Sequence, residues 1–228
     1  MTDDALDLTV LGLQYRVRDG ASFRTILNLE RLKIASGEFV GLKGTSGSGK
    51  STFLKLISGI VTPQSGSVSW GEVVLSQLGD AERDDWRGRY CGFLFQDFRL
   101  FGALSALENV LLPLTFRGRI SAKDRKRAIE LLDTYGVPAQ TQASLLSRGE
   151  MQRTALVRVL MTSPKVILAD EPTASLDYHN ALQVMDALTQ AAADLKATLL
   201  VVTHDCQMLN RFERVLTIEN GTIRGDGL

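Results

Sequence analysis

The sequence has 228 residues, of which 44% are hydrophobic and 23% charged, a composition that is typical of globular proteins and excludes an intrinsically disordered chain. Its 26 Lys and Arg residues balance its 26 Asp and Glu residues, so the formal net charge is +0 and no broad nucleic-acid-binding surface is expected. No apolar run approaches the roughly 18 residues of a membrane-spanning helix, and the acidic start lacks the features of a secretory signal. We therefore expect a cytoplasmic protein that binds no nucleic acid.

The first forty residues alternate between apolar and polar side chains as β-strands do, with a turn signal at Asp19 and Gly20. This pattern predicts an antiparallel sheet. A short apolar run over 39–42 follows, then a Gly/Ser-rich loop, then a helical stretch whose apolar residues are Phe53, Leu54, Leu56 and Ile57. The order is therefore strand, loop, helix.

The pattern is helical from about Leu104 to Leu160. One helix in this stretch has a capping box formed by Ser121 and Asp124 at its start and is closed by Gly136. Strands and helices then alternate, with strands predicted at 166–169, 198–202 and 214–218 and helices at 181–195 and 206–210. Together these segments predict an α/β core with a helical insertion, in one compact unit with two lobes.

The strongest motif lies between the strand at 39–42 and the helix after it, and it fits G-x-x-x-x-G-K-[ST]. Glycines in such a loop let several backbone N–H groups converge on phosphate oxygens, aided by the positive end of the helix. Lys50 would neutralise the β and γ phosphates, Ser51 would ligate Mg²⁺, and Thr52 would meet the α phosphate. A flexible Gly/Ser turn is the alternative, and Lys50 with Ser51 argues against it. The predicted phosphate-binding residues are Gly44, Thr45, Ser46, Gly47, Ser48, Gly49, Lys50, Ser51 and Thr52.

A second motif is the apolar strand from Val166, which ends in the adjacent carboxylates Asp170 and Glu171. Successive strand residues point to opposite sides, so Asp170 can hold Mg²⁺ while Glu171 polarises an attacking water. Such a pair alone is also common in solvated turns, and it is the phosphate-binding loop that favours the functional interpretation.

Three reactive side chains have no motif around them. Cys91 and Cys206 lie outside any metal-binding spacing, and we expect both to be free thiols in the core. His179 is expected to be a surface residue.

The segment 146–153, Leu-Ser-Arg-Gly-Glu-Met-Gln-Arg, resembles the L-S-G-G-Q signature of ATP-binding-cassette ATPases, the nucleotide-binding domains of ABC transporters. Further marks of the family stand in the expected order. Gln96 matches the Q-loop, 175–177 the D-loop and His204 the switch histidine, and Tyr15 is similar to the aromatic residue on which adenine stacks. These motifs span nearly the whole chain.

The resemblance implies an α/β P-loop NTPase core, with a mixed central sheet and an N-terminal antiparallel β-subdomain, and an inserted helical subdomain. One ABC ATPase domain would fill residues 1–228. Its RecA-like and antiparallel β lobe would cover about 1–96 and 165–228, and its helical signature subdomain about 97–164.

The resemblance also implies a dimer in which two ATP molecules, with Mg²⁺, are sandwiched between two copies of the chain. Ser147 and Gly149 would donate to the γ phosphate held by Lys50 of the other copy, and Glu150 and Asp177 would also belong to the nucleotide-binding residues. Gln96 would help to ligate Mg²⁺ and sense the γ phosphate, and Gln96, Glu171 and His204 would form the catalytic set. In this chain Arg148 replaces the first glycine of the signature, which is tolerable if its side chain points outward.

Segments 108–114 and 169–177 resemble the branch of the family that contains lipoprotein-releasing, macrolide-exporting and cell-division members. This likeness implies an ATPase subunit that drives a separate transmembrane permease of export or periplasm-acting type, on the cytoplasmic face of the inner membrane. The permease would contact Phe98 to Leu107, through an apolar patch of Phe98, Leu100, Phe101 and Leu104. Burial of these four residues in the helical lobe is the alternative.

Three other functions share some or all of these motifs. A non-transporting ABC ATPase that regulates a membrane partner, of the cell-division type, has every motif. A P-loop kinase would not need the signature, Gln96 and His204 together. A DNA-repair cassette would need a long coiled coil, for which 228 residues leave no room.

Overall fold

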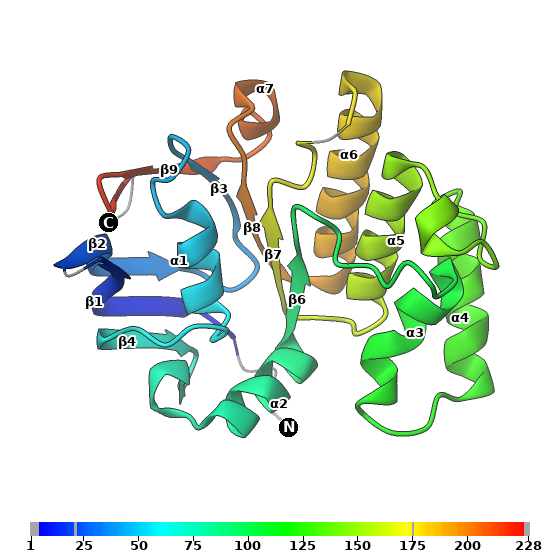
Figure 1. Ribbon diagram of the computed structural model, residues 1–228, viewed down its shortest axis with the longest axis horizontal. Coiled ribbons are helices and arrows are strands. Elements are labelled where there is room, and N and C mark those ends of the chain that lie inside the picture. The colour runs from blue at the N-terminus through cyan, green and yellow to red at the C-terminus, as the bar shows by residue number, and fades with distance from the viewer. Residues whose placement is uncertain (1–4, 21, 175, 226–228) are drawn as a thin grey trace.

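The computed structural model describes residues 5–20, 22–174 and 176–225, which form two β-sheets and a set of helices (Figure 1). The first sheet has four antiparallel strands in the order β2-β1-β4-β5. Its strands are β1 (Leu8–Asp19), β2 (Ser22–Ile34), β4 (Ser65–Trp70) and β5 (Val73–Val74). The antiparallel sheet predicted from the first forty residues is thus confirmed.

The second sheet has six strands in the order β10-β9-β3-β8-β7-β6. Neighbours from β9 to β6 are parallel, and β10 is antiparallel to β9, so the sheet is mixed as expected. Its strands are β3 (Phe39–Lys43), β6 (Cys91–Leu94), β7 (Val166–Asp170), β8 (Thr198–Val202), β9 (Arg214–Glu219) and β10 (Thr222–Arg224). The carboxyl ends of β3, β6, β7 and β8 meet at one edge, which is where open α/β sheets bind ligands.

The helices cover the second sheet and extend beyond its β6 end (Figure 1). They are α1 (Lys50–Ile57), α2 (Asp80–Tyr90), α3 (Ala106–Thr115), α4 (Ala122–Thr134), α5 (Arg148–Leu160), α6 (Tyr178–Leu195) and α7 (Cys206–Leu209). Two short 3₁₀ turns occur at Leu75–Gln77 and Ala143–Leu145. The predicted helical insertion over 104–160 corresponds to α3, α4 and α5. Among the described residues, no helix is both long enough and apolar enough to cross a membrane.

Both faces of the second sheet are buried, which explains why its strands are continuous apolar runs. Along β7, Val166 and Leu168 pack with α1 and the first sheet, whereas Ile167 and Ala169 pack with α5 and α6. A third apolar cluster joins α3, α4 and α5. Helix α5 therefore packs both against the core and within the helical insertion, which fixes one to the other.

The segment between α1 and β6 has weak sequence patterns. Helix α2, Asp-Ala-Glu-Arg-Asp-Asp-Trp-Arg-Gly-Arg-Tyr, buries only Trp86 and so shows no apolar stripe. Trp86 stacks on Trp70 of β4, with 6.1 Å between ring centroids. The tertiary contact, not local periodicity, holds this helix.

The expectation of two core thiols is wrong for Cys206, which is exposed in the first turn of α7. Cys91 is half-buried at the start of β6, where burial raises the pKa of its thiol to about 12. His179 is exposed on α6, as expected.

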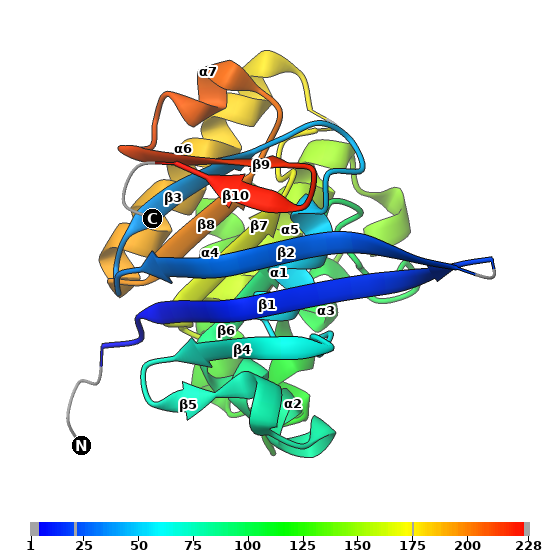
Figure 2. The same ribbon diagram turned by 90° about the vertical axis from the view of Figure 1, so that its left-hand side faces the viewer.

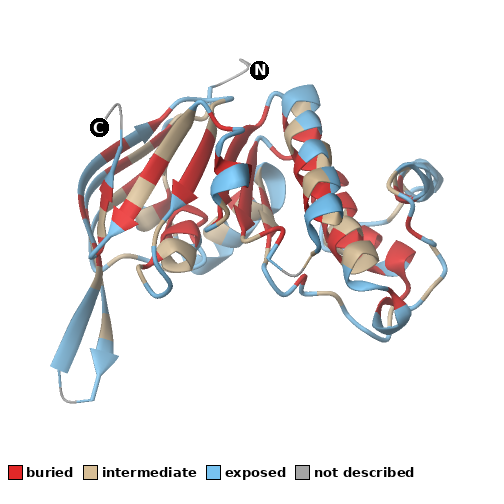
Figure 3. Ribbon diagram, turned by 90° about the horizontal axis from the view of Figure 1, so that it is seen from above, coloured by how far each residue is buried: buried red, intermediate tan, exposed pale blue. Residues whose placement is uncertain are grey.

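The hairpin of β1 and β2 is much longer than the other strands and projects from the body of the molecule (Figure 2). Figure 3 shows its far end as exposed, in contrast to the buried strands behind it. The strands are anchored at their other end, where Leu8 pairs with Ile34 and both are buried.

Candidate active site

A cavity of about 660 Å³ opens where β3, β6, β7 and β8 end. Each of these strands leads directly into one part of its wall, because the carboxyl ends of parallel strands lie at one sheet edge. Its lining consists of Arg24, Ile26, Gly44, Thr45, Ser46, Gly47, Gly49, Lys50, Ser51, Thr52, Gln96, Glu171 and His204. The phosphate-binding loop, Gln96, Glu171 and His204 were found separately in the sequence, and they form one site.

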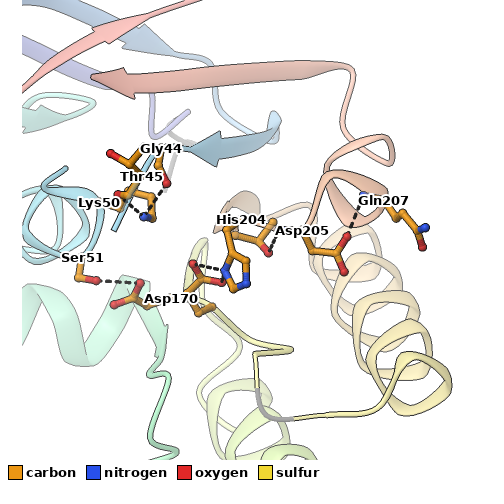
Figure 4. Close-up of polar contacts among 10 residues, drawn as sticks. Gly44, Thr45, Lys50, Ser51, Asp170, His204, Asp205 and Gln207 are labelled. Atoms are coloured by element: carbon orange, nitrogen blue, oxygen red, sulfur yellow. Dashed lines mark hydrogen bonds and ion pairs between the residues drawn. The ribbon is translucent and has the colours of Figure 1, made fainter. Parts of the chain in front are cut away.

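The loop after β3 wraps around the start of α1. Lys50, the first residue of that helix, donates from Nζ to the carbonyl oxygens of Gly44 at 2.9 Å and Thr45 at 3.0 Å (Figure 4). Gly44 has no space for a side chain, since a Cβ atom there would lie 2.5 Å from Ile218 Cγ2 and 2.7 Å from Ser48 Oγ. Gly49 caps the helix with φ of 104°, a conformation that favours glycine. The loop thus holds a cation over a helix N-terminus.

Ser48 does not line the cavity but carries a buried hydroxyl oxygen with no hydrogen-bond partner among the described residues. Its backbone N–H donates to Thr45 at 3.2 Å. A buried unpaired hydroxyl is costly unless a partner joins it. Because Ser48 is absent from the cavity lining, its contact with phosphate stays a prediction.

Ser51 Oγ donates to Asp170 Oδ1 at 3.0 Å, which joins the start of α1 to the end of β7 (Figure 4). Only 7% of Asp170 is exposed, and this burial raises its pKa, although the hydrogen bond from Ser51 acts in the opposite direction. A buried carboxylate beside a hydroxyl oxygen is a donor set suited to Mg²⁺, which takes few protein ligands and completes its shell with phosphate oxygens and water. No group of three or more His, Cys, Asp or Glu side chains forms a metal site in the described part of the chain, and this Mg²⁺ site would not require one.

Glu171 follows β7 in a left-handed conformation, with φ of 49°. Its N–H donates to Val202 of β8 at 2.9 Å, so the neighbouring strand fixes this unusual backbone. His204, just beyond β8, donates from Nδ1 to the Glu171 carboxylate at 2.9 Å (Figure 4). The Glu171 side chain is 12% exposed and that of His204 is 70% exposed. The carboxylate is thus held on the cavity wall by an imidazole that faces the opening.

The different directions of Asp170 and Glu171 were expected from strand alternation. In the structure β7 ends at Asp170, and the left-handed backbone of Glu171 directs its side chain to His204. The two carboxylates point apart as expected, but the reason is the left-handed backbone of Glu171 and not alternation along the strand.

Gln96 comes from the loop after β6 and is exposed on the cavity wall. In the same loop, two and three residues further on, Phe98 and Arg99 both have positive φ, of 58° and 49°. Arg158 of α5 holds this bend, because its guanidinium donates to both of their carbonyl oxygens at 2.6 Å. The Gln96 loop is therefore tied directly to the helical insertion.

Ser147, Gly149 and Glu150 lie at the start of α5 and do not line the cavity. Ser147 caps the helix, and its Oγ donates to Glu150 Oε2 at 2.7 Å and accepts from the Glu150 N–H at 3.3 Å. The hydroxyl bond to the carboxylate, together with one from the Ser147 N–H to Glu150 Oε2 at 2.8 Å, lowers the pKa of Glu150 and keeps its carboxylate ionised. Within one chain, the signature residues are thus separated from the phosphate-binding loop.

Asp177 caps α6 close to these residues. It accepts a hydrogen bond from the Asn180 N–H at 3.0 Å, which lowers its pKa, and a Cβ atom on Gly149 would lie 3.7 Å from Asn180 Oδ1. The signature and the D-loop are therefore neighbours. Ser175, the first residue of the predicted D-loop, lies outside the described residues.

The family described as ABC transporter matches residues 27–174. The chain is 39% identical to the lipoprotein-releasing system ATP-binding protein LolD of Psychrobacter arcticus, over 89% of this chain and 91% of that protein. It is 37% identical to the protein of the same name in Bordetella pertussis, over 99% and 97% of the two chains. The chain belongs to the ABC transporter family. It is an ABC ATPase, which binds and hydrolyses ATP.

Solved structures of ABC cassettes agree with this identification. A dimeric ATP-binding cassette in a post-hydrolysis state, bound to ADP and phosphate, superposes with a TM-score of 0.88. It shares 36% identity and covers 96% of this chain and 97% of its own. The ABC cassette fold expected from the motifs is confirmed.

Two further residues singled out in the sequence, Tyr15 and Arg148, do not line the cavity. Tyr15 lies in β1 of the first sheet, and its half-buried side chain packs against the core. Its adenine-stacking role stays a prediction. Arg148 is exposed, which meets the condition under which it is tolerable in the signature, and its guanidinium lies over the ring of Phe98, 5.9 Å from the centroid.

The expected permease-contacting patch is only partly exposed. Phe98 is 8% exposed and packs in the core, as the alternative interpretation held, whereas Phe101 is 58% exposed. Leu100 and Leu104 are half-buried.

Sequence reasoning missed two residues of the cavity wall, Arg24 and Ile26 of β2. They belong to no motif, and the signal that could have found them is weak: they lie on a strand opposite Tyr15 and its neighbours.

Proposed function

We propose that this chain is the ATP-hydrolysing subunit of a membrane complex that releases lipoproteins, and that it acts as a dimer with two ATP and Mg²⁺ between its copies. The observation that carries this proposal is the split site. Lys50, Ser51 and Glu171 line one cavity, and Asp170 is hydrogen-bonded to Ser51. Ser147 and Gly149 lie outside that cavity in the same chain. A second copy would supply its own signature to complete each site.

The chemistry follows from the positions of these groups. Lys50 and the N–H groups of the loop offset the negative charge of the triphosphate. Glu171 accepts a proton from the water that attacks the γ phosphorus, and His204 holds the carboxylate in place through Nδ1. Ser51 and Asp170 would hold Mg²⁺, with Gln96 at the rim, and the ion would neutralise charge on the phosphate oxygens.

The partner is a separate integral membrane permease, which holds this chain at the cytoplasmic face of the inner membrane. Phe101, the most exposed apolar side chain of the patch, lies in the loop that Arg158 ties to α5. A permease seated on Phe98 to Leu107 would therefore receive motion from both the Gln96 loop and the signature helix. We divide the chain accordingly, with the core lobe at about 1–96 and 165–228 and the helical lobe at about 97–164.

The variant Glu171→Gln tests the catalytic part. It should bind ATP with nearly unchanged affinity, lose almost all phosphate release, and form a dimer with ATP that light scattering detects. Steady-state hydrolysis close to that of the wild type would overturn the assignment of Glu171 as the base.

Purification from membranes tests the partner. The wild-type chain should be recovered with an integral membrane permease, identified by mass spectrometry, and purified complex should release a lipoprotein from vesicles only with ATP. Recovery with a membrane regulator of cell-wall enzymes, without lipoprotein release, would contradict the transport role and leave the ATPase assignment intact.

A further inference from the structure

The cavity has a second cation besides Lys50. Arg24 of β2 lines it, and this residue belongs to none of the sequence motifs. Among the described residues, the Arg24 side chain makes no hydrogen bond or ion pair, whereas Lys50 donates from Nζ to two carbonyl oxygens of the loop. A guanidinium has five donors in a planar fork that suits phosphate oxygens.

A β-bulge turns Arg24 toward the cavity. The register of β1 and β2 shifts between Tyr15, which faces Leu27, and Arg16, which faces Thr25, so Ile26 is the extra residue. Beyond the bulge Arg24 is opposite Val17, and opposite residues share a face of the hairpin. By alternation along β1, that face also carries Tyr15, which packs against the core.

The strand is held in place two residues from Arg24. A Cβ atom on Gly49 would lie 3.3 Å from Ile26 Cγ2 and 3.1 Å from Leu27 Cδ2, so these side chains touch the phosphate-binding loop. The Asn28 N–H donates to the Gly221 carbonyl at 2.7 Å, in the turn between β9 and β10. These contacts fix β2 relative to the phosphate-binding loop. The backbone that carries the Arg24 side chain therefore has a defined position beside the cavity.

The topology assigns Arg24 to one end of the nucleotide. The hydrolytic groups Gln96, Glu171 and His204 follow β6, β7 and β8, on one side of β3 and its loop. Strand β2 is attached to the β9–β10 turn, on the other side of β3. A triphosphate whose γ phosphate lies beside Glu171 has its nucleoside end below the hairpin.

We infer that Arg24 is a nucleotide-binding residue of this chain and pairs with the α phosphate of the bound nucleotide. This inference rests on the ATP-binding role of the cavity. Both ATP and ADP carry this phosphate, so the contact contributes equally to the binding of substrate and product. It therefore sets nucleotide affinity rather than the rate of bond cleavage.

The affinities of Arg24→Gln for ADP and for the non-hydrolysable analogue AMP-PNP test the inference by calorimetry. Both dissociation constants should rise about tenfold, as expected for loss of a charge-assisted hydrogen bond. Arg24→Lys keeps the charge without the fork and should recover part of the affinity. The thermal midpoint without nucleotide should match that of the wild type, because Arg24 is exposed.

Arg18→Gln is the matched control. Arg18 lies on the same hairpin opposite Phe23, on the other face, and does not line the cavity, so its removal should leave both dissociation constants unchanged. Unchanged affinity in Arg24→Gln, an equal loss in Arg18→Gln, or a loss for AMP-PNP but not for ADP would overturn the inference. Failure of the wild-type chain to bind either nucleotide would instead overturn the proposed function.

Discussion

Asp170 is a buried carboxylate that is also proposed to bind Mg²⁺. Its pKa is raised chiefly because burial disfavours the charged carboxylate. Since the folded-state pKa exceeds the ordinary value, Asp170 takes up a proton at a higher pH than an exposed aspartate does. The ionised form is the one that Mg²⁺ requires, so the proton and the ion compete for the same oxygens.

We expect the Mg²⁺-dependent part of the ATP affinity to fall as the pH is lowered from neutral, before an ordinary aspartate near pH 3.9 would titrate. Calorimetry with and without Mg²⁺ across this range measures the effect. In Asp170→Asn the Mg²⁺-dependent part should be small at every pH. A pH dependence in Asp170→Asn equal to that of the wild type would show that another group titrates.

Tyr15 lies on the inner face of the hairpin, packed against the core. If its ring also supports adenine, Tyr15→Ala should raise the dissociation constant of ATP with little change in the maximal rate, and Tyr15→Phe should behave as the wild type because it keeps the ring. Binding assays and steady-state hydrolysis separate these effects. A fall in the rate alone would make Tyr15 a structural residue.

The three helices α3, α4 and α5 begin in the same way. Each has a serine at its N-cap and a carboxylate three residues later, in the pairs Ser105 and Glu108, Ser121 and Asp124, and Ser147 and Glu150. The bonds from the serine lower the pKa of each carboxylate. The caps should therefore weaken when the pH falls through these lowered values, because a protonated carboxyl no longer accepts both bonds.

Ser105 is the buried member of this set, with 9% exposure, and its N–H and Oγ both donate to Glu108 at 2.8 Å. We expect Ser105→Ala to lower the free energy of unfolding by about 1 kcal/mol, measured by urea denaturation. Ser121→Ala is the control, since its cap is solvent-exposed and its loss should be no larger. A larger loss in Ser121→Ala would contradict the importance of burial.

Sequence patterns predicted most elements whose local signal is strong. The alternation of β1 and β2, the loop before α1 and the capping box of α4 all appear in the structure as expected. Helix α2 was missed, because its stability comes from Trp86 packing on Trp70 rather than from an apolar stripe.

Most members of the site were predictable by motif, but Arg24 and Ile26 were not, and neither were the contacts within the site. The bond between His204 and Glu171 depends on the pairing of β7 with β8 and on the left-handed backbone of Glu171. Arg24 reaches the cavity through a bulge that no short motif encodes. Both depend on contacts between segments far apart in the sequence.

One copy of the chain supplies the cavity of one proposed site and the signature of the other. The cavity has the groups that bind the triphosphate and activate water, and the signature lies at the start of α5, beside Asn180 of α6. Helix α5 also packs against the core, and its Arg158 holds the loop after Gln96. A change at the nucleotide can therefore reach the helical lobe through rigid contacts.

Complementation between two inactive variants tests the shared site most directly. Lys50→Ala disables the cavity, and Ser147→Asp keeps an N-cap acceptor but sets a negative charge where the γ phosphate of the other copy would bind. A mixed dimer has one intact site, formed by Lys50 of one copy and Ser147 of the other. We predict that each variant alone releases almost no phosphate and that mixing them restores hydrolysis well above the sum of the two; a mixture that shows only that sum would contradict a site built from two copies.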